Sequence, residues 1–252
     1  MIADDAVPSD AGRIVDVMRG AFDRAWLDIT LYGCAGIEHY VEAQIRLGAP
    51  ARNRYMVCRK DGAVVGVTEF RTLGETLFWN NVAVLPAEQG SGVGPTLLRA
   101  MVKDARGLGL RQLSLDVLDS NVKGLASYER IGLKTTGERS YWRGAFPRGA
   151  GLGGFSIADH AQAEVVHARF GFSQFSVEGR GGTWSVGRLG GRYFRLLGWE
   201  CASDPGLAGF LGALEPEREL LAMLEGAPPR EVPWQRLAVA KRMSGPLESL
   251  RV

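Results

Sequence analysis

Residues 82–96, which read V-A-V-L-P-A-E-Q-G-S-G-V-G-P-T, constrain the fold of this chain more than any other segment. An extended apolar run leads into a loop with glycines at positions 90, 92 and 94, and a helical pattern begins at Pro95. Glycines let a backbone turn its N–H groups toward a ligand, and the positive end of a helix favours phosphate. The segment therefore predicts a strand, a phosphate-binding loop and a helix, in that order.

Two common phosphate-loop patterns do not fit this loop. A Walker A loop needs a lysine directly after its last glycine, and none follows here. A dinucleotide fingerprint needs a third glycine at its sixth position, where a count from Gly90 reaches Pro95 and a count from Gly92 reaches Leu97. The pattern that remains is Gln/Arg-x-x-Gly-x-Gly/Ala, which is matched by Gln89, Gly92 and Gly94.

The segments around the loop predict an α/β (α+β) domain of about 145 residues. Apolar residues at helical spacing indicate two helices before the first strand. Asp61-Gly62 between two β-branched runs is typical of a hairpin turn. The expected helices are 11–22, 36–47, 95–107 and 121–131, and the expected extended runs are 54–59, 63–72, 76–85, 112–117 and 133–143.

The glycine-dense stretch 149–154 (G-A-G-L-G-G) predicts a boundary between two domains, 1–148 and 149–252. The second part begins with a helix and continues with a three-strand meander, two helices and a late extended run, so it is a smaller α+β domain. Because this order echoes the first part, the second domain is interpreted as a degenerate half of the same kind. Its expected elements are helices 157–169, 205–214 and 217–225, and extended runs 173–178, 183–188, 192–197 and 235–243.

Charge and composition exclude several kinds of protein. The net charge is +2, and basic and acidic side chains nearly balance in both parts, so nothing favours a nucleic acid or a membrane surface as partner. No apolar run reaches the length of a membrane-spanning helix, and the acidic N-terminus does not resemble a signal peptide. The three cysteines form no C-x-x-C, and the three histidines lack the spacing of zinc ligands. We expect a cytoplasmic protein without a metal.

Beyond the loop itself, motifs on both sides resemble the GNAT superfamily of acyl-CoA-dependent N-acyltransferases. V-A-V precedes the loop, L-L-R-A-M-V-K-D-A follows on the helix, and L-S-L-D-V forms the next strand. The segment N-V-K-G-L-A-S-Y-E-R-I-G-L is similar to the family region N-x-x-A-x-x-x-Y-x-x-x-G-F, with Leu133 in place of the final Phe. The resemblance covers residues 10–143 and is densest over 82–137. It implies a mixed, mostly antiparallel twisted sheet flanked by helices.

The resemblance also implies roles for single residues. Backbone N–H groups of the loop would bind the CoA pyrophosphate, the strand before it would pair with pantetheine, and the N–H of Val84 would point at the thioester carbonyl. Asn121 would contact the CoA arm, and Tyr128 would be the general acid. The implied binding set is Val82, Ala83, Val84, Gln89, Gly90, Ser91, Gly92, Val93, Gly94, Thr96, Asn121 and Tyr128.

The residue types suit the expected chemistry. A backbone N–H can stabilise the oxyanion that forms when an amine attacks a thioester. A phenol stays protonated at neutral pH and can protonate the leaving thiolate. The amine must also lose a proton, and Glu69 is our candidate base, with Glu75 as another carboxylate on the central strands. Asn80 or Asn81 could hold a water, while Trp26, Tyr32 and Trp79 are candidates for an acceptor pocket or for the core.

The predicted function is an N-acetyltransferase that moves an acetyl group from acetyl-CoA to a primary amine of a small molecule or a peptide. The alternative is a non-catalytic sensor that binds acyl-CoA without turnover. The second domain contains no further Gln/Arg-x-x-Gly-x-Gly/Ala, so we do not expect it to bind CoA. It would shape the acceptor site or support a homodimer.

Overall fold

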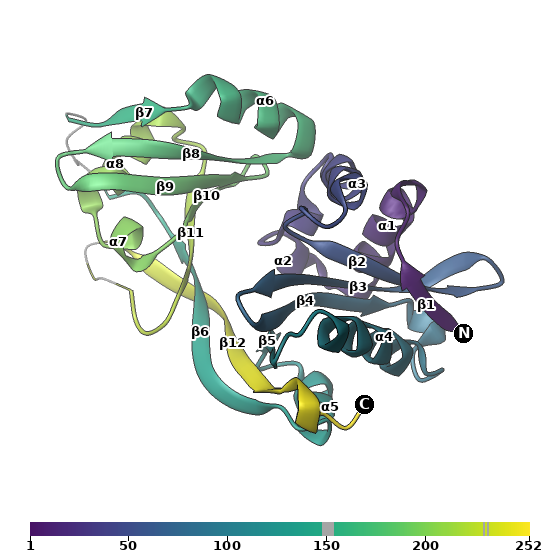
Figure 1. The fold of residues 1–252 in the computed structure, drawn as a ribbon. Coiled ribbons are helices and arrows are strands. Elements are labelled where there is room, and N and C mark those ends of the chain that lie inside the picture. The colour runs from purple at the N-terminus through teal and green to yellow at the C-terminus, as the bar shows by residue number, and fades with distance from the viewer. Residues whose placement is uncertain (148–153, 229, 231) are drawn as a thin grey trace. The chain divides into compact units, whose positions relative to one another are not determined.

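The computed structural model describes residues 1–147, 154–228, 230 and 232–252 and contains two compact units (Figure 1). Unit 1 comprises Met1–Asp28, Ile37–Gly137 and Lys241–Val252, and unit 2 comprises Ile29–Gly36 and Glu138–Ala240. Each unit is thus assembled from separate stretches of the chain. The predicted glycine-dense boundary lies almost wholly outside the described residues, so the division into 1–148 and 149–252 stays a prediction.

The helices and strands that the sequence predicts for residues 11–143 are present, and they lie in unit 1 except that β6 passes into unit 2 after Gly137. Two short elements, β1 and α2, were not predicted. The strand order is β1-β2-β3-β4-β5-β12-β6, with β1 to β4 antiparallel and β5 parallel to β4. The elements are β1 (Ile2–Asp5), α1 (Ala11–Ala21), α2 (Arg24–Leu27), α3 (Ile37–Leu47), β2 (Arg54–Lys60), β3 (Ala63–Leu73), β4 (Thr76–Val84), α4 (Val93–Gly107), β5 (Gln112–Leu118), α5 (Val122–Arg130), β6 (Lys134–Gly144) and β12 (Trp234–Pro246).

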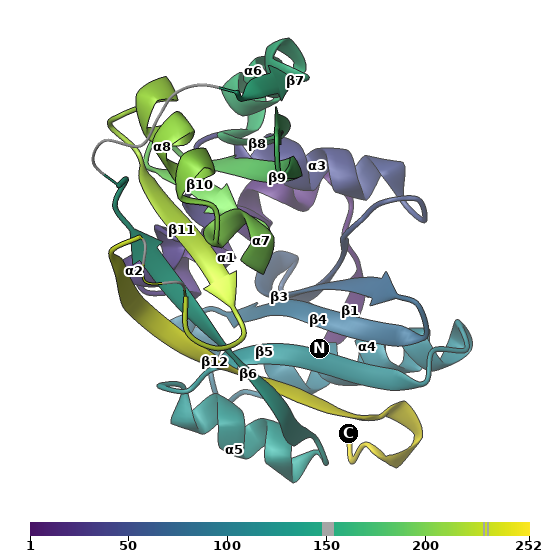
Figure 2. The ribbon, with the colours of Figure 1, turned by 90° about the vertical axis from the view of Figure 1, so that its left-hand side faces the viewer.

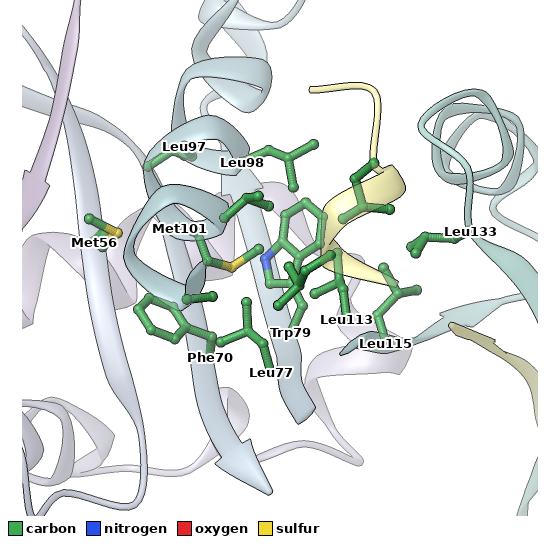
Figure 3. Packing of buried hydrophobic residues seen from close by; sticks show 14 of the residues in the cluster. Met56, Phe70, Leu77, Trp79, Leu97, Leu98, Met101, Leu113, Leu115 and Leu133 are labelled. Atoms are coloured by element: carbon green, nitrogen blue, oxygen red, sulfur yellow. The ribbon is translucent and has the colours of Figure 1, made fainter. Parts of the chain in front are cut away.

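The main core of unit 1 lies between α4 and the sheet, while α1 and α3 cover the opposite face (Figure 1). Figure 3 shows Trp79 among Leu98, Met101 and Leu113, and its indole N–H donates to the Thr68 hydroxyl at 2.6 Å. This packing holds β4 and α4 together on either side of the glycine loop.

The start of α4 is positioned by a glycine on the sheet. A Cβ at Gly66 of β3 would collide with the side chain of Val93, the first residue of α4. Val93 itself is only 1% exposed. The missing side chain at position 66 therefore lets the helix start pack directly on the sheet and sets where the loop lies.

The last part of β12 completes unit 1. Strand β12 runs between β5 and β6 (Figure 2). The hydroxyls of Ser114 and Ser244 lie 2.5 Å apart, and the Arg106 side chain donates to the carbonyl of Leu247 at 2.5 Å. Met243 and Leu247 are buried in the same core as α4. Residues near the end of the sequence are thus part of the unit that holds the glycine loop.

Unit 2 repeats one feature of unit 1, a pair of parallel strands joined through helices. Its strand order is β12-β6-β11-β10-β9-β8-β7, and β10 and β11 are parallel. Its core contains Phe175, Phe194 and Leu207. The elements are β7 (Ser156–Ala158), α6 (His160–Phe170), β8 (Phe172–Gly179), β9 (Gly182–Leu189), β10 (Tyr193–Leu196), α7 (Trp199–Ala202), α8 (Pro205–Leu214) and β11 (Glu219–Leu224).

Two predictions for unit 2 were wrong. The expected helix at 217–225 is strand β11, in which Leu220, Leu221 and Ala222 are all buried between β10 and β6. Glu, Leu, Ala and Met favour helix, but burial on both faces of a sheet overrides that preference. The expected helix at 157–169 begins only at His160, because Ile157 pairs with Val177 of β8.

Candidate active site

A cavity of about 430 Å³ lies in unit 1 where β4 and β5 diverge. The two strands pair from Thr76 opposite Gln112 to Trp79 opposite Leu115, and the cavity begins where this pairing ends. Its walls come from the end of α1 and α2, from β4, from β5 with the loop after it, and from α5. The lining residues are Ala21, Phe22, Asp23, Trp26, Trp79, Asn80, Asn81, Val82, Leu115, Asp116, Val117, Leu118, Ser120, Asn121 and Tyr128.

A β-bulge explains the divergence. Glu69 of β3 pairs with Asn81 of β4, whereas the next residue, Phe70, pairs with Trp79. Asn80 is therefore an extra residue in β4. Bulges bend a strand and increase its twist, so β4 turns away from β5 at this position.

Beyond the bulge, the edge of β4 that faces the cavity is open. The N–H of Leu85 donates to the carbonyl of Val65 at 2.9 Å, and hydrogen-bonded pairs alternate along antiparallel strands. Ala83 is therefore bonded to β3, and the backbone groups of Val82 and Val84 point away from β3. Of the three residues whose backbone is predicted to pair with pantetheine, Val82 and Val84 therefore lie with their N–H and C=O groups on the open edge. Ala83 has its backbone groups against β3.

The start of α4 is suited to an anion. Gly90 and Gly92 have φ angles of +79° and +90°, a conformation that favours glycine, and no side chain caps the helix. The first N–H groups of a helix have no partner within it. A Cβ at Gly90, Gly92 or Gly94 would meet nothing within 4 Å, so the space beside the loop is open. The loop can therefore receive a phosphate with its backbone.

The side chains of the loop contact the protein itself. The Ser91 hydroxyl donates to the carbonyl of Glu88 at 2.6 Å, and the Thr96 hydroxyl donates to the carbonyl of Gly92 at 2.9 Å. Gln89 is exposed, and Val93 is buried against the sheet. At the glycines and at the start of α4, the groups available to a ligand are therefore backbone N–H groups and not side chains.

Asn121 and Tyr128 both lie in the cavity wall. Asn121 caps α5, and its side-chain oxygen accepts from the N–H of Gly124 at 2.9 Å. The Tyr128 ring packs edge-to-face on Trp79, with 5.5 Å between ring centroids. The Tyr128 hydroxyl has no hydrogen-bond partner among the described residues. Burial raises the pKa of this phenol to about 12, so it is a proton donor at neutral pH.

Glu69 lies behind the cavity wall. It is 4% exposed, and its carboxylate accepts from the side-chain amides of Asn81 at 2.6 Å and Asn80 at 3.4 Å. Its role as the base stays a prediction. Glu75, the other candidate, lies in the exposed turn before β4, at the end of the strand opposite to Val84, and pairs with Arg111.

Two carboxylates in the wall were not predicted. Asp116 of β5 forms an ion pair with Arg242 of β12, with one N···O distance of 2.8 Å. It alternates with the buried Leu115 and Val117, and this alternation was a signal that its side chain leaves the core. Asp23 caps α2 by accepting from the backbone N–H of Trp26 at 2.8 Å.

The aromatic candidates divide between the units. Trp26 and Trp79 both line the cavity, and Trp79 belongs to the core as well. Tyr32 belongs to unit 2 and is buried.

Among the residues that the structure describes, no three His, Cys, Asp or Glu side chains lie together as a metal site would require. Among the same residues, no helix is long and apolar enough to cross a membrane.

The glycine loop and nearly all of the residues that line the cavity belong to a segment that matches a known protein family. The sequence model of the Acetyltransferase (GNAT) family matches residues 22–133, a stretch that includes α2, the glycine loop and Tyr128. The chain contains a GNAT acetyltransferase domain. The open strand edge, the uncapped helix start and the unpaired phenol all lie within this GNAT domain.

A curated relative matches part of the chain. N-alpha-acetyltransferase RimI of Mycobacterium tuberculosis is 35% identical over 100 residues, which are 38% of this chain and 61% of that protein. The chain thus spans less than two thirds of the length of this relative.

Solved structures resemble nearly the whole chain. A tandem GNAT protein from the clavulanic acid biosynthesis pathway has a TM-score of 0.64 at 15% identity and covers 97% of this chain and 98% of its own. A GCN5-related N-acetyltransferase from Sphaerobacter thermophilus has a TM-score of 0.60 at 14% identity, with 98% and 95% covered. At these identities the likeness establishes the fold, and the tandem protein fits a second GNAT-like fold in unit 2.

Proposed function

We propose that the GNAT domain transfers an acetyl group from acetyl-CoA to a primary amine by direct attack. One observation carries this proposal: the same cavity has an open strand edge on one side and the unpaired phenol of Tyr128 on the other. An open edge can pair with an extended amide-containing arm, and a phenol beside it can protonate a leaving group.

Binding of the donor would rest on backbone groups. The N–H groups from Gly90 to Gly94 and the start of α4 would hold the pyrophosphate, because the N-cap residue of α4, Gly92, offers no side-chain cap; the N–H of Ser91 donates to the Glu88 carbonyl at 3.3 Å. The backbone of Val82 and Val84 would pair with the pantetheine arm, and Asn121 would contact that arm from α5. The open space beside the three glycines supports this assignment.

Acetyl-CoA supplies an activated carbonyl, and the chain supplies charge stabilisation and protons. A C–N bond forms when the amine attacks the thioester carbon, and the C–S bond then breaks. The N–H of Val84 would donate to the carbonyl oxygen as negative charge develops there. Tyr128 would give its phenolic proton to the departing sulfur and recover one from water.

The acceptor ammonium must lose a proton before it attacks. Asp116 and Asp23 reach the cavity directly, whereas Glu69 reaches it only through Asn80 and Asn81. Glu69 could therefore take the proton only through a relay, by way of an asparagine or a water.

The acceptor is proposed to be a small amine or the terminal amine of a peptide. Because the mycobacterial relative is named an N-alpha-acetyltransferase, a peptide α-amine is the first compound to test. A homodimer stays a separate prediction, which light scattering of the purified chain would test.

A panel of amines with a free-thiol assay tests the function. The full chain is incubated with acetyl-CoA and alanyl peptides, phenethylamine or spermidine, and we expect CoA release that depends on one of the amines. Acetyl-CoA binding without amine-dependent release would favour the sensor alternative. If calorimetry detects no binding of CoA at all, both readings are wrong.

A further inference from the structure

The β-bulge in β4 places two consecutive asparagines at the cavity, and both contact one buried carboxylate. Asn80 and Asn81 line the cavity, while Glu69 lies behind them on β3. The amide nitrogen of Asn81 donates to Glu69 at 2.6 Å, and that of Asn80 donates to it at 3.4 Å. The two amide groups are therefore oriented by the same acceptor.

This contact decides which amide atoms remain for a ligand. A side-chain amide has one donor nitrogen and one acceptor oxygen, and an ionised carboxylate only accepts. Because both nitrogens face Glu69, each amide leaves its Oδ1 for the cavity. Neither Oδ1 has a hydrogen-bond partner among the described residues. A ligand between them would meet two neighbouring acceptors.

A second hydrogen bond, to Asn53, also holds the side-chain amide of Asn80 in this orientation. Its amide nitrogen also donates to the Oδ1 of Asn53 at 3.2 Å. Asn53 is held in turn, since its backbone N–H donates to Gln44 at 3.1 Å, and both of these side chains are buried. The network is thus built before any ligand arrives, which reduces the cost of binding.

We infer that Glu69 is a positioning residue that turns the amide oxygens of Asn80 and Asn81 toward the acceptor amine. In the neutral form that attacks the thioester, a primary amine carries two N–H bonds and a secondary amine carries one, so two fixed acceptor oxygens match the primary amine. The cavity would therefore prefer a primary amine over a secondary amine of the same shape. This inference rests on the proposed transferase function and names the feature that would select its acceptor.

The same contacts argue against direct proton transfer to Glu69. A general base must reach the proton that it removes, either directly or through one water. The Glu69 carboxylate is outside the cavity lining and already accepts from both amides and from the Tyr55 hydroxyl at 3.4 Å. Its position suits holding the amides better than exchanging protons with a substrate.

The test compares Glu69→Gln with the wild type in the full chain. The matched probes are phenethylamine with N-methylphenethylamine, and an alanyl peptide with its N-methylalanyl counterpart. In Glu69→Gln one amide must face a side-chain NH2 and turn over. We expect the KM of the primary amine to rise about tenfold, kcat to stay within about threefold, and the preference over the N-methyl compound to fall.

A variant that lacks both asparagines shows whether Glu69 affects amine binding through Asn80 and Asn81. In the Asn80→Leu/Asn81→Leu variant, adding Glu69→Gln should change KM and amine preference by less than about twofold, because the amides that it orients are gone. Tyr55→Phe is the control, since it removes another donor to Glu69 without touching either amide, and it should leave the amine preference unchanged.

The possible outcomes separate this inference from the function on which it rests. If the wild type releases no CoA with any amine, the proposed function and this inference are both wrong. If the wild type turns over and Glu69→Gln lowers kcat about a hundredfold at unchanged KM, Glu69 is the base and only this inference is wrong. An equal effect of Glu69→Gln in the leucine background would also overturn it.

Discussion

Both units contain a pair of parallel strands joined through helices, but α4 of unit 1 and α8 of unit 2 differ at their first residues. In unit 1, β4 leads through α4 to the parallel strand β5, and Gly92 precedes α4 without a side-chain cap. In unit 2, β10 leads through α7 and α8 to the parallel strand β11. There the Asp204 carboxylate accepts from the backbone N–H groups of Gly206 at 2.8 Å and Leu207 at 3.0 Å.

This difference shows how one fold serves two purposes. The Asp204 carboxylate takes the place at α8 that a phosphate would take at α4, and its negative charge repels a second anion. The short helix α7, which directly follows β10, has no side-chain cap, but it carries an acidic residue, Glu200, in its first turn. A carboxylate at the helix start stabilises unit 2, whereas an empty cap leaves unit 1 able to bind a ligand.

The largest expected effect comes from placing a carboxylate at the open helix start. Gly92→Glu should weaken acetyl-CoA binding on the order of a hundredfold or more, because it adds like charge and a strained φ to the loop. Isothermal titration calorimetry measures it. Gly74→Glu is the matched control, since Gly74 also has a positive φ of +59° but lies in an exposed turn. An equal loss of acetyl-CoA affinity in both variants would show that the effect is not specific to the start of α4.

Tyr128→Phe separates binding from transfer within unit 1. We expect kcat to fall about a hundredfold or more while the Kd of acetyl-CoA stays within about threefold, because the change removes a proton donor and keeps the ring. Since the pKa of Tyr128 is about 12, this phenol stays protonated up to about pH 10 and causes no loss of activity below that pH. Steady-state rates across pH check both points, and unchanged turnover would exclude Tyr128 as the acid.

Asp204→Ala tests the other side of the comparison. Removing the cap of α8 should lower the free energy of unfolding by about 1 kcal/mol, and Asp204→Asn should lose less because asparagine also caps helices. Urea unfolding measures the loss. The Kd of acetyl-CoA should not change, and a tighter or weaker Kd would mean that α8 takes part in binding the donor.

The smallest expected effect concerns a side chain of the loop. Ser91→Ala removes an exposed hydroxyl that donates to the Glu88 carbonyl, so the Kd of acetyl-CoA should change by about twofold at most. The same titration as for Gly92→Glu measures it. A tenfold loss would show that side chains, and not only the backbone of the loop, hold the phosphates.

Sequence predicts the fold well where the deciding forces are local. The apolar runs of β2 and β3, the Asp61-Gly62 turn and the apolar face of α4 each depend on residues close in sequence. Strand β11 depends instead on being buried between β10 and β6, which its own helix-favouring residues do not show. The strand conformation of this segment is therefore determined by its neighbours in the assembled sheet.

The same distinction holds for the candidate site. The glycine loop and the segment from Asn121 to Tyr128 are continuous motifs, so the sequence alone is enough to select them as candidates. The position of Glu69 behind Asn80 and Asn81 depends on a bulge that no motif indicates. The partner of Asp116, Arg242, is 126 residues away in the chain, beyond the reach of any local pattern.

Each unit contains segments that are separated in the chain by the other unit, and this limits the order in which the units can fold. Residues 241–252 belong to unit 1 but follow all of unit 2 in the chain. Arg106 and Leu247, which are bonded to each other, are 141 residues apart. A ribosome that has made the glycine loop, the cavity and Tyr128 has therefore not yet supplied the last strand of their unit. Contacts this distant in sequence form slowly, so the proposed acetyl-CoA site becomes complete only after translation has passed through unit 2.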